Sequence, residues 1–200
     1  LAGELGEAVY VQGDISDPAT AHALVAAARE RWGRLDGLVN NAAVTAEVPL
    51  ADVDAVTVDH WNRVLGVNVV GTFLVSQAAL PLLREADDGW ILNITSIAGI
   101  RQTGSSLPYA VSKAAVDHLT TILAKHAGGG VRVNAVAPGP VWTPLNPSDR
   151  EAGEVSRFGA STPMKRPAQP EELAPAYVFL ASPQCSSYIT GEILPVIGGY

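Results

Sequence analysis

Short runs of apolar and β-branched residues alternate with longer segments of helical periodicity along this chain of 200 residues. The short runs, which are typical of strands, lie at 8–13, 35–42, 90–96, 131–138 and 191–198. The helical segments lie between them at 16–33, 57–83, 108–125 and 170–182. Such regular alternation predicts the α/β class, with a parallel sheet covered by helices on both faces. Because 48% of the residues are apolar, the chain can bury one sizeable core, and we expect 1–200 to form a single domain.

Several helical segments carry recognisable end signals. Ser16 or Asp17 is a candidate N-cap for the first segment, and Gly33 is placed to end it. Thr57 is a candidate N-cap for the second segment, and Pro81 is expected to kink or end that helix. These signals support the alternation drawn from periodicity.

The net charge of −7 argues against a nucleic-acid partner, which would require a clustered basic face. No run of eighteen apolar residues occurs, so we expect no membrane span, and the first residues lack the basic and apolar regions of an export signal. The single cysteine, Cys185, has neither a disulfide partner nor ligand neighbours at metal spacing, so we expect no metal site. These features together predict a cytoplasmic protein.

Tyr109 and Lys113 lie four residues apart in a helical segment, so their side chains share one helix face. A free tyrosine ionises near pH ~10, and lowering its pKa by two or three units requires roughly 3–4 kcal/mol. A cation about 4 Å away supplies a comparable energy at an effective dielectric of ~20. The pair therefore predicts a tyrosine that exchanges protons near neutral pH; the alternative is an amphipathic tyrosine resting on a lysine stem.

Other polar or flexible residues follow predicted strands, at the edge of a parallel sheet where ligands bind. Ser96 ends the third strand, the run 40–43 (NNAA) follows the second, and Pro138–Gly139 follow the fourth. Asn68 lies in an otherwise apolar helical stretch and needs a hydrogen-bond partner, which a satisfied core amide would also have. The run 40–43 could equally be a simple turn.

Taken together and in this order, these residues and Asp14 resemble the short-chain dehydrogenase/reductase family over essentially all 200 residues. The resemblance implies a Rossmann-type doubly wound parallel sheet that lacks its first two strands in these residues. It also implies an enzyme that transfers a hydride between NAD or NADP and a carbonyl or secondary alcohol.

The resemblance further implies roles for four residues. Tyr109 would be the general acid/base, and Ser96 would hydrogen-bond the substrate oxygen and stabilise its developing charge. Lys113 would lower the pKa of Tyr109 and hold the ribose hydroxyls of the nicotinamide. Asn68 would position a water that links Lys113 to solvent.

Further residues are implied to contact the cofactor or the substrate. Asp14 and Ile15 would lie beside the adenine, and the other implied cofactor contacts are Asn41, Ala42, Ala43, Pro138, Gly139, Val141 and Thr143. The polar stretch 143–169 predicts a loop over the substrate, with Ile97 and Trp142 along the pocket wall. Trp142 could equally be a core residue.

The glycine-rich turn and the first two strands of the family pattern do not occur in these residues. A βαβ unit takes 30 or more residues, so a front segment on the order of 50 residues is expected. Without it the strand at 8–13 would have no neighbour to pair with. We therefore expect a longer natural protein whose front is disordered, cleaved or omitted; the residue that selects NAD or NADP lies in that front.

Alternatives and partners follow from the same resemblance. A cofactor-binding or scaffold protein of this fold without turnover is the main alternative. An epimerase or dehydratase would need a longer substrate domain than the residues after Gly139 provide. The C-terminal part resembles bacterial reductases of glucose/ribitol or 3-oxoacyl substrates, which implies a small-molecule alcohol, sugar or keto-acyl substrate. The helices at 57–83 and 108–125 resemble those that pair across a two-fold axis, which implies a homodimer or homotetramer.

Overall fold

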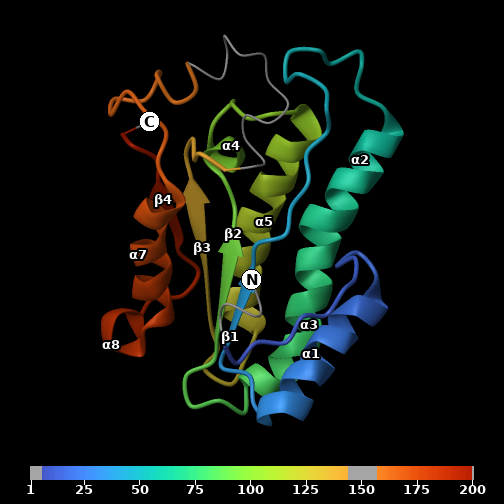
Figure 1. Cartoon of the computed structure of the whole chain (residues 1–200), viewed down its shortest axis with the longest axis vertical. Helices are drawn as coiled ribbons and strands as arrows, with labels where there is room; N and C mark the ends of the chain where they lie inside the picture. Colours follow the sequence, from blue (N-terminus) through green and yellow to red (C-terminus); the bar gives the residue numbers. More distant parts are fainter. Residues whose placement is uncertain (1–5, 144–156, 200) are drawn as a thin grey trace.

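Four parallel strands form one sheet in the order β1-β2-β3-β4, with helices on both faces (Figure 1). The computed structural model describes residues 6–143 and 157–199. The elements in chain order are α1 (Pro18–Trp32), β1 (Gly37–Asn40), α2 (Val58–Leu65), the π-helix η1 (Gly66–Gly71), α3 (Thr72–Leu83), β2 (Trp90–Ile94), α4 (Ile97–Ile100), α5 (Leu107–His126), β3 (Arg132–Pro138), α7 (Pro170–Ala181), α8 (Pro183–Ser186) and β4 (Ile193–Val196). The predicted α/β class and parallel sheet are confirmed.

The predicted helix signals act as caps. Asp17 accepts a hydrogen bond from the backbone N–H of Ala19, and Gly33 ends α1 with a φ of 71°, a left-handed conformation that glycine adopts without a steric penalty. Thr57 caps α2 in a capping box with His60. Sequence-local hydrogen bonds therefore set where these helices begin and end.

Alternate residues of each central strand face opposite sides of the sheet, which builds two separate cores. Ile91 and Val133 are fully buried against α3 and α5 on one face. Leu92 and Val136 are fully buried against α7 on the other. A sheet covered on both faces explains why its central strands read as continuous apolar runs.

Two predicted elements differ from the structure. Residues 8–13 form no strand, because a strand needs a hydrogen-bonded neighbour and β1 pairs only with β2 among the described residues. The predicted helix 57–83 is continuous but widens into η1 at its centre, and it runs through Pro81 to Leu83 instead of ending there.

The helical segment Val58–Leu83 is long and apolar enough, by length and composition, to cross a membrane. Its mean hydropathy is 1.5, and 44% of the tested window is buried inside the fold. Core helices of globular proteins share these properties, and α3 packs against α1 and β1, so the segment is weak evidence for a span.

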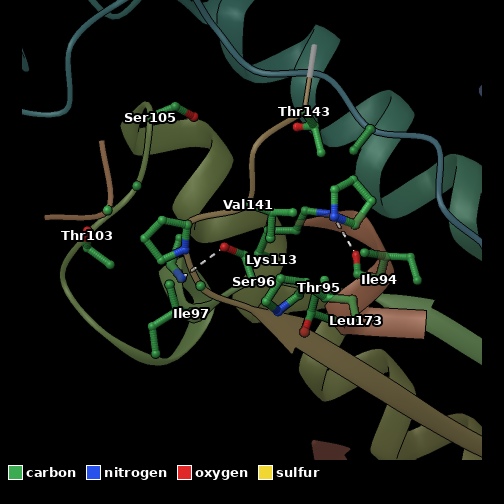
Figure 2. A pocket seen from close by; sticks show the side chains of 18 of the residues that line it. Ile94, Thr95, Ser96, Ile97, Thr103, Ser105, Lys113, Val141, Thr143 and Leu173 are labelled. Carbon is green, nitrogen blue, oxygen red and sulfur yellow. Dashed lines mark hydrogen bonds between the residues drawn. The ribbon is translucent and has the colours of Figure 1, made fainter. Parts of the chain in front are cut away.

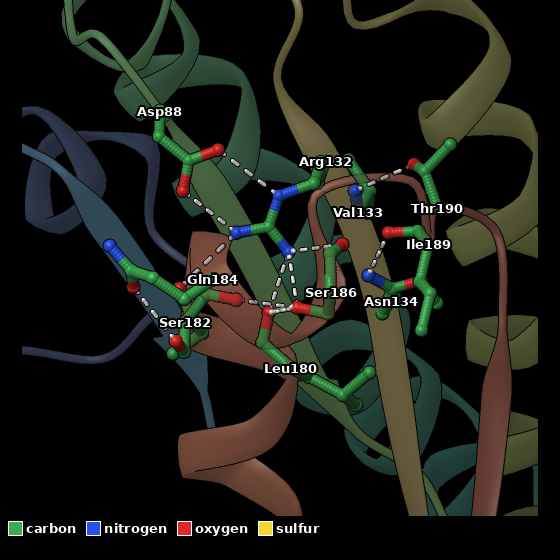
Figure 3. Close-up of polar contacts among 11 residues, drawn as sticks. Asp88, Arg132, Val133, Asn134, Leu180, Ser182, Gln184, Ser186, Ile189 and Thr190 are labelled. Carbon is green, nitrogen blue, oxygen red and sulfur yellow. Dashed lines mark hydrogen bonds and ion pairs between the residues drawn. The ribbon is translucent and has the colours of Figure 1, made fainter.

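A buried arginine joins the start of β3 to the helices on the α7 face (Figure 3). The guanidinium of Arg132 forms a two-pronged ion pair with Asp88, at 3.2 and 2.9 Å. It also donates to the backbone oxygens of Leu180 and Ala181 and to Ser186. These bonds satisfy carbonyls at the end of α7 and tie that helix to the sheet.

Candidate active site

A cavity of about 1040 Å³ opens where the strands end, at their carboxyl edge. Val39 of β1, Ile94 of β2 and Pro138 of β3 reach it, and α5 and α7 contribute further walls. Ligands bind at this edge in parallel α/β sheets, and the size is typical of a small-molecule site. We therefore take this cavity as the candidate active site.

Most of the sequence-predicted residues meet at this cavity, although they come from separate parts of the chain. Those that line it are Asn41, Ala43, Ser96, Ile97, Tyr109, Lys113, Pro138, Gly139, Val141 and Thr143. Parallel pairing explains the convergence, because it brings the ends of β1, β2 and β3 to one edge.

Tyr109, Lys113 and Ser96 form the polar centre of the cavity. Lys113 is 4% exposed, and its Nζ donates to the backbone oxygen of Ile94 at 2.7 Å (Figure 2). The same Nζ lies 5.5 Å from the centre of the Tyr109 ring. Ser96 caps the short helix α4 by accepting from the N–H of Ala98, and its hydroxyl also hydrogen-bonds Tyr109. Helical spacing places the first two side chains together, and the end of β2 brings the third to them.

The predicted lowering of the Tyr109 pKa is wrong for this fold. Burial raises the pKa of Tyr109 above its usual value, and the hydrogen bond with Ser96 opposes this only in part. The ammonium of Lys113 lies 5.5 Å from the centre of the ring and is hydrogen-bonded to Ile94, and it is not among the causes of this shift. The phenol is therefore a proton donor at neutral pH.

Burial also acts on the ammonium of Lys113. It lowers the pKa of Lys113 to about 8, while the carboxylate of Asp117 raises it. A cation with one hydrogen bond to the described part of the chain, facing a cavity, retains N–H groups that a ligand can use.

Asn68 does not line the cavity. Its side chain, 2% exposed, donates to the backbone oxygen of Val44 and to Ser112, and it accepts from the N–H of Val44. The side chain is therefore a satisfied core amide, and the role of Asn68 in positioning a water stays a prediction. Asn68 lies in η1, a helix type that often marks functional regions, and it ties the loop after β1 to α5 just before Lys113.

The residues predicted for the adenosine side lie away from the main cavity. Ile15 and Ala42 line a second cavity of about 230 Å³, which shares Val39 and Asn41 with the first. Asp14 lines neither; its carboxylate accepts two hydrogen bonds from Ser16, and these lower its pKa. The shared residues make the two cavities neighbours along β1.

The predicted substrate loop is closed at its base by the bridge between Val141 and Ala168. Residues 144–156 of the predicted loop lie outside the described part of the chain. Beyond them, Arg157 and Phe158 line the cavity, as predicted for a covering loop. Trp142 does not line it: the indole is 43% exposed and packs against Phe158, with ring centres 6.3 Å apart.

Sequence reasoning missed part of the cavity wall. Leu173, Ala174, Tyr177 and Val178 of α7 line it, and their helical spacing indicated only an apolar face, not which surface it would cover. Asp117 was missed although it follows Lys113 by four residues, the same spacing that identified the Tyr109–Lys113 pair. That signal was available in the sequence.

A family model described as enoyl-(acyl carrier protein) reductase matches residues 1–200. The chain belongs to the short-chain dehydrogenase/reductase family. It is 44% identical over 199 residues to a protein of Streptomyces violaceoruber whose name assigns it to granaticin polyketide synthase as ketoacyl reductase 2; the match covers 99% of this chain and 79% of that protein.

A second relative is the glucose and ribitol dehydrogenase homolog 2 of Arabidopsis thaliana, which is 40% identical over 197 residues. That match covers 98% of this chain and 66% of the relative, and a chloroplastic NADPH-dependent aldehyde reductase of the same plant is covered over 57% of its length. The chain thus spans less than two thirds of some of its curated relatives.

Solved structures of the family share the fold. ElxO with NADP bound superposes with a TM-score of 0.86 at 30% identity, covering 96% of this chain and 77% of that one. Levodione reductase superposes with a TM-score of 0.81 at 33% identity, covering 93% and 74%. The family and the structures with NADP or NADPH bound support dependence on NAD or NADP, as the sequence predicts.

Proposed function

We propose that this oxidoreductase catalyses hydride transfer between NAD(P) and a carbonyl or secondary alcohol, with Tyr109 as general acid/base. The observation that carries the proposal is the convergence of Tyr109, Ser96 and Lys113 on one cavity at the carboxyl edge of the sheet. The hydroxyl of Ser96 hydrogen-bonds the phenol of Tyr109, and both residues line the cavity in which a substrate oxygen would lie.

Each side chain has a distinct task in carbonyl reduction. Tyr109 donates its phenolic proton to the carbonyl oxygen as the C=O bond becomes C–OH, and it takes that proton back in the reverse reaction. Ser96 donates a hydrogen bond to the same oxygen and stabilises the negative charge that develops there. With its pKa raised, the phenol of Tyr109 is protonated at neutral pH, which is the form that carbonyl reduction requires.

The cavity walls fit the nicotinamide half of the cofactor. Lys113 has ammonium N–H groups for ribose hydroxyls, and the Pro138–Gly139 turn brings bare backbone to the cavity wall. A Cβ on Gly139 would lie 3.0 Å from the Cα of Ile197, so that turn packs closely against the end of β4. Bound NAD(P) supplies or accepts the hydride at the substrate carbon. Val141 and Thr143 would lie beside its carboxamide and phosphate, and the neighbouring cavity along β1 would take the adenosine side.

The substrate is a small carbonyl or alcohol compound, for which the names of the relatives suggest keto-acyl, sugar or aldehyde chemistry. Hydroxyl groups of Thr103 and Ser105 and the apolar face of α7 border the cavity, so it can hold both polar and apolar parts of such a molecule. A single catalytic domain, a homodimer or homotetramer and a cytoplasmic location remain predictions from the sequence.

Replacement of Tyr109 by phenylalanine tests the proposal. We expect Tyr109→Phe to lower kcat by about 10²–10⁴-fold, because the general acid is lost, while cofactor affinity stays nearly unchanged. The measurement is absorbance change at 340 nm with NADH or NADPH and a panel of carbonyl compounds, on the intact protein.

The matched control is Tyr188→Phe, which removes a fully exposed phenol far from the cavity wall and should leave turnover unchanged. Cofactor binding without turnover in the unsubstituted protein would instead favour a binding or scaffold protein. Loss of folding in Tyr109→Phe would favour a structural tyrosine.

A further inference from the structure

Asp117 lies behind the catalytic-type residues and has no role in the proposed mechanism. It follows Lys113 by one helical turn on α5, so the two side chains share a helix face. Both reach the end of β2: Lys113 donates to the backbone oxygen of Ile94, and Asp117 is hydrogen-bonded by the next residue, Thr95. Asp117 is thus held against the same strand end as the lysine.

The carboxylate is tightly covered on its outer side. A Cβ on Gly99 would lie 2.7 Å from Oδ2 of Asp117 and 2.8 Å from the backbone nitrogen of Ala114, so α4 packs directly on α5 at this point. Oδ1 of Asp117 is buried and accepts no hydrogen bond from any described residue. Leaving a buried carboxylate oxygen without a donor costs stability, so an acid at this position calls for an explanation.

We propose that Asp117 is a positioning residue that acts through Lys113: its partly buried carboxylate, one helical turn along α5, keeps the ammonium of Lys113 charged at the cavity. The inference rests on the proposed function. Burial works against both charges, raising the pKa of Asp117 and lowering that of Lys113, while each group favours the charged form of the other. Because the pKa of Lys113 is only about 8, the presence of Asp117 decides how much of the lysine is charged at slightly alkaline pH.

Charges on the neighbouring elements do not act on the pair. α5 packs against α2, η1, α4 and β3, whose charged or titratable residues are Asp59, His60 and Arg63 on α2 and Arg132 on β3. None of these shifts the pKa of Lys113 or of Asp117. Tyr109 is the remaining titratable neighbour, with its ring beneath the ammonium.

The test follows the titration of Lys113 directly. These residues contain three lysines, Lys113, Lys125 and Lys165, so the Cε signals of a ¹³C-lysine-labelled protein can be assigned by Lys113→Arg. In Asp117→Asn, which keeps the shape but removes the charge, the Lys113 midpoint should move to lower pH. The alkaline limb of kcat/KM should move in the same direction, a shift that a merely structural role would not produce.

Three further variants sharpen the result. Asp117→Glu should shift the Lys113 midpoint less than Asp117→Asn does. Asp59→Asn, which removes an exposed carboxylate on α2, should leave the midpoint unchanged. If Asp117→Asn does not fold, Asp117→Ala takes its place, because it also removes the carboxylate charge and should shift the midpoint in the same direction.

A folded Asp117→Asn protein, or a folded Asp117→Ala protein in its place, whose Lys113 midpoint is unchanged would overturn the inference. The titration midpoint of Lys113 can be measured without turnover, so the inference about Asp117 and the proposed function can fail independently. If the variant shifts the Lys113 midpoint but the unsubstituted protein shows no turnover, the oxidoreductase mechanism is overturned. The electrostatic coupling of Lys113 and Asp117 then still holds.

Discussion

Buried charged side chains are extensively hydrogen-bonded at one end of the sheet and incompletely hydrogen-bonded at the other. At the amino end of β3, Arg132 is paired with Asp88 and donates to oxygens of α7 and α8, so its guanidinium is extensively hydrogen-bonded (Figure 3). At the carboxyl end of β2, and counting only partners within 6–143 and 157–199, Lys113 has one hydrogen bond and Asp117 has a buried oxygen without one. A satisfied network stabilises the fold, whereas incompletely satisfied charges beside a cavity are typical of a site that binds and reacts.

The largest effect on stability is expected for Arg132, at the amino end of β3, where the buried charge is extensively hydrogen-bonded. Arg132→Ala should lower the free energy of unfolding by about 3–5 kcal/mol, because it leaves a partly buried carboxylate and several buried carbonyls without donors. Urea unfolding followed by circular dichroism measures the change. Arg34→Ala is the matched control, since it removes an exposed arginine paired with Asp36 and should change stability little. Similar losses in both variants would contradict the comparison.

At the reactive end, Ser96→Ala should affect rate more than stability. Removing one hydrogen-bond donor to a developing oxyanion lowers kcat by about 10²–10³-fold, with a much smaller change in KM. Steady-state kinetics on the intact protein measure both constants. Ser105→Ala, which removes a hydroxyl of the same cavity that is bonded to Thr45, should have a weaker effect. Equal losses in kcat would argue that Ser96 does not contact the reacting oxygen.

Lys113→Met should stabilise the fold at pH 7, in contrast to the loss expected for Arg132. The pKa of Lys113 is lowered from 10.5 to about 8 by burial, so between these values the unfolded chain binds more protons and stability rises with pH. Below pH 8 the buried charge costs about 3 kcal/mol, which methionine avoids. Unfolding free energies at pH 7 and pH 10.5 test this: the advantage of methionine should shrink as pH rises. A constant difference would show that the lysine charge is not the cause.

How far the sequence predicts this site depends on how local each signal is. The spacing of Tyr109 and Lys113 fixes their common face because both lie on one helix, and the structure places them at one cavity. Asn68 was assigned a role at the cavity by resemblance, but its η1 position turns it toward Val44 and Ser112. The strand at 8–13 was expected from composition alone, and a strand does not form without a partner.

The alternation of strands and helices and the helix caps are properties that the sequence by itself determined. They depend on periodicity and on contacts within a few residues along the chain. Only the tertiary structure decided the direction of the Tyr109 pKa, the α7 wall of the cavity and the pairing of Asp117 with Thr95. These properties depend on how far folding excludes water from each group and on which segments distant in sequence come into contact. The spacing of residues along the chain predicts neither.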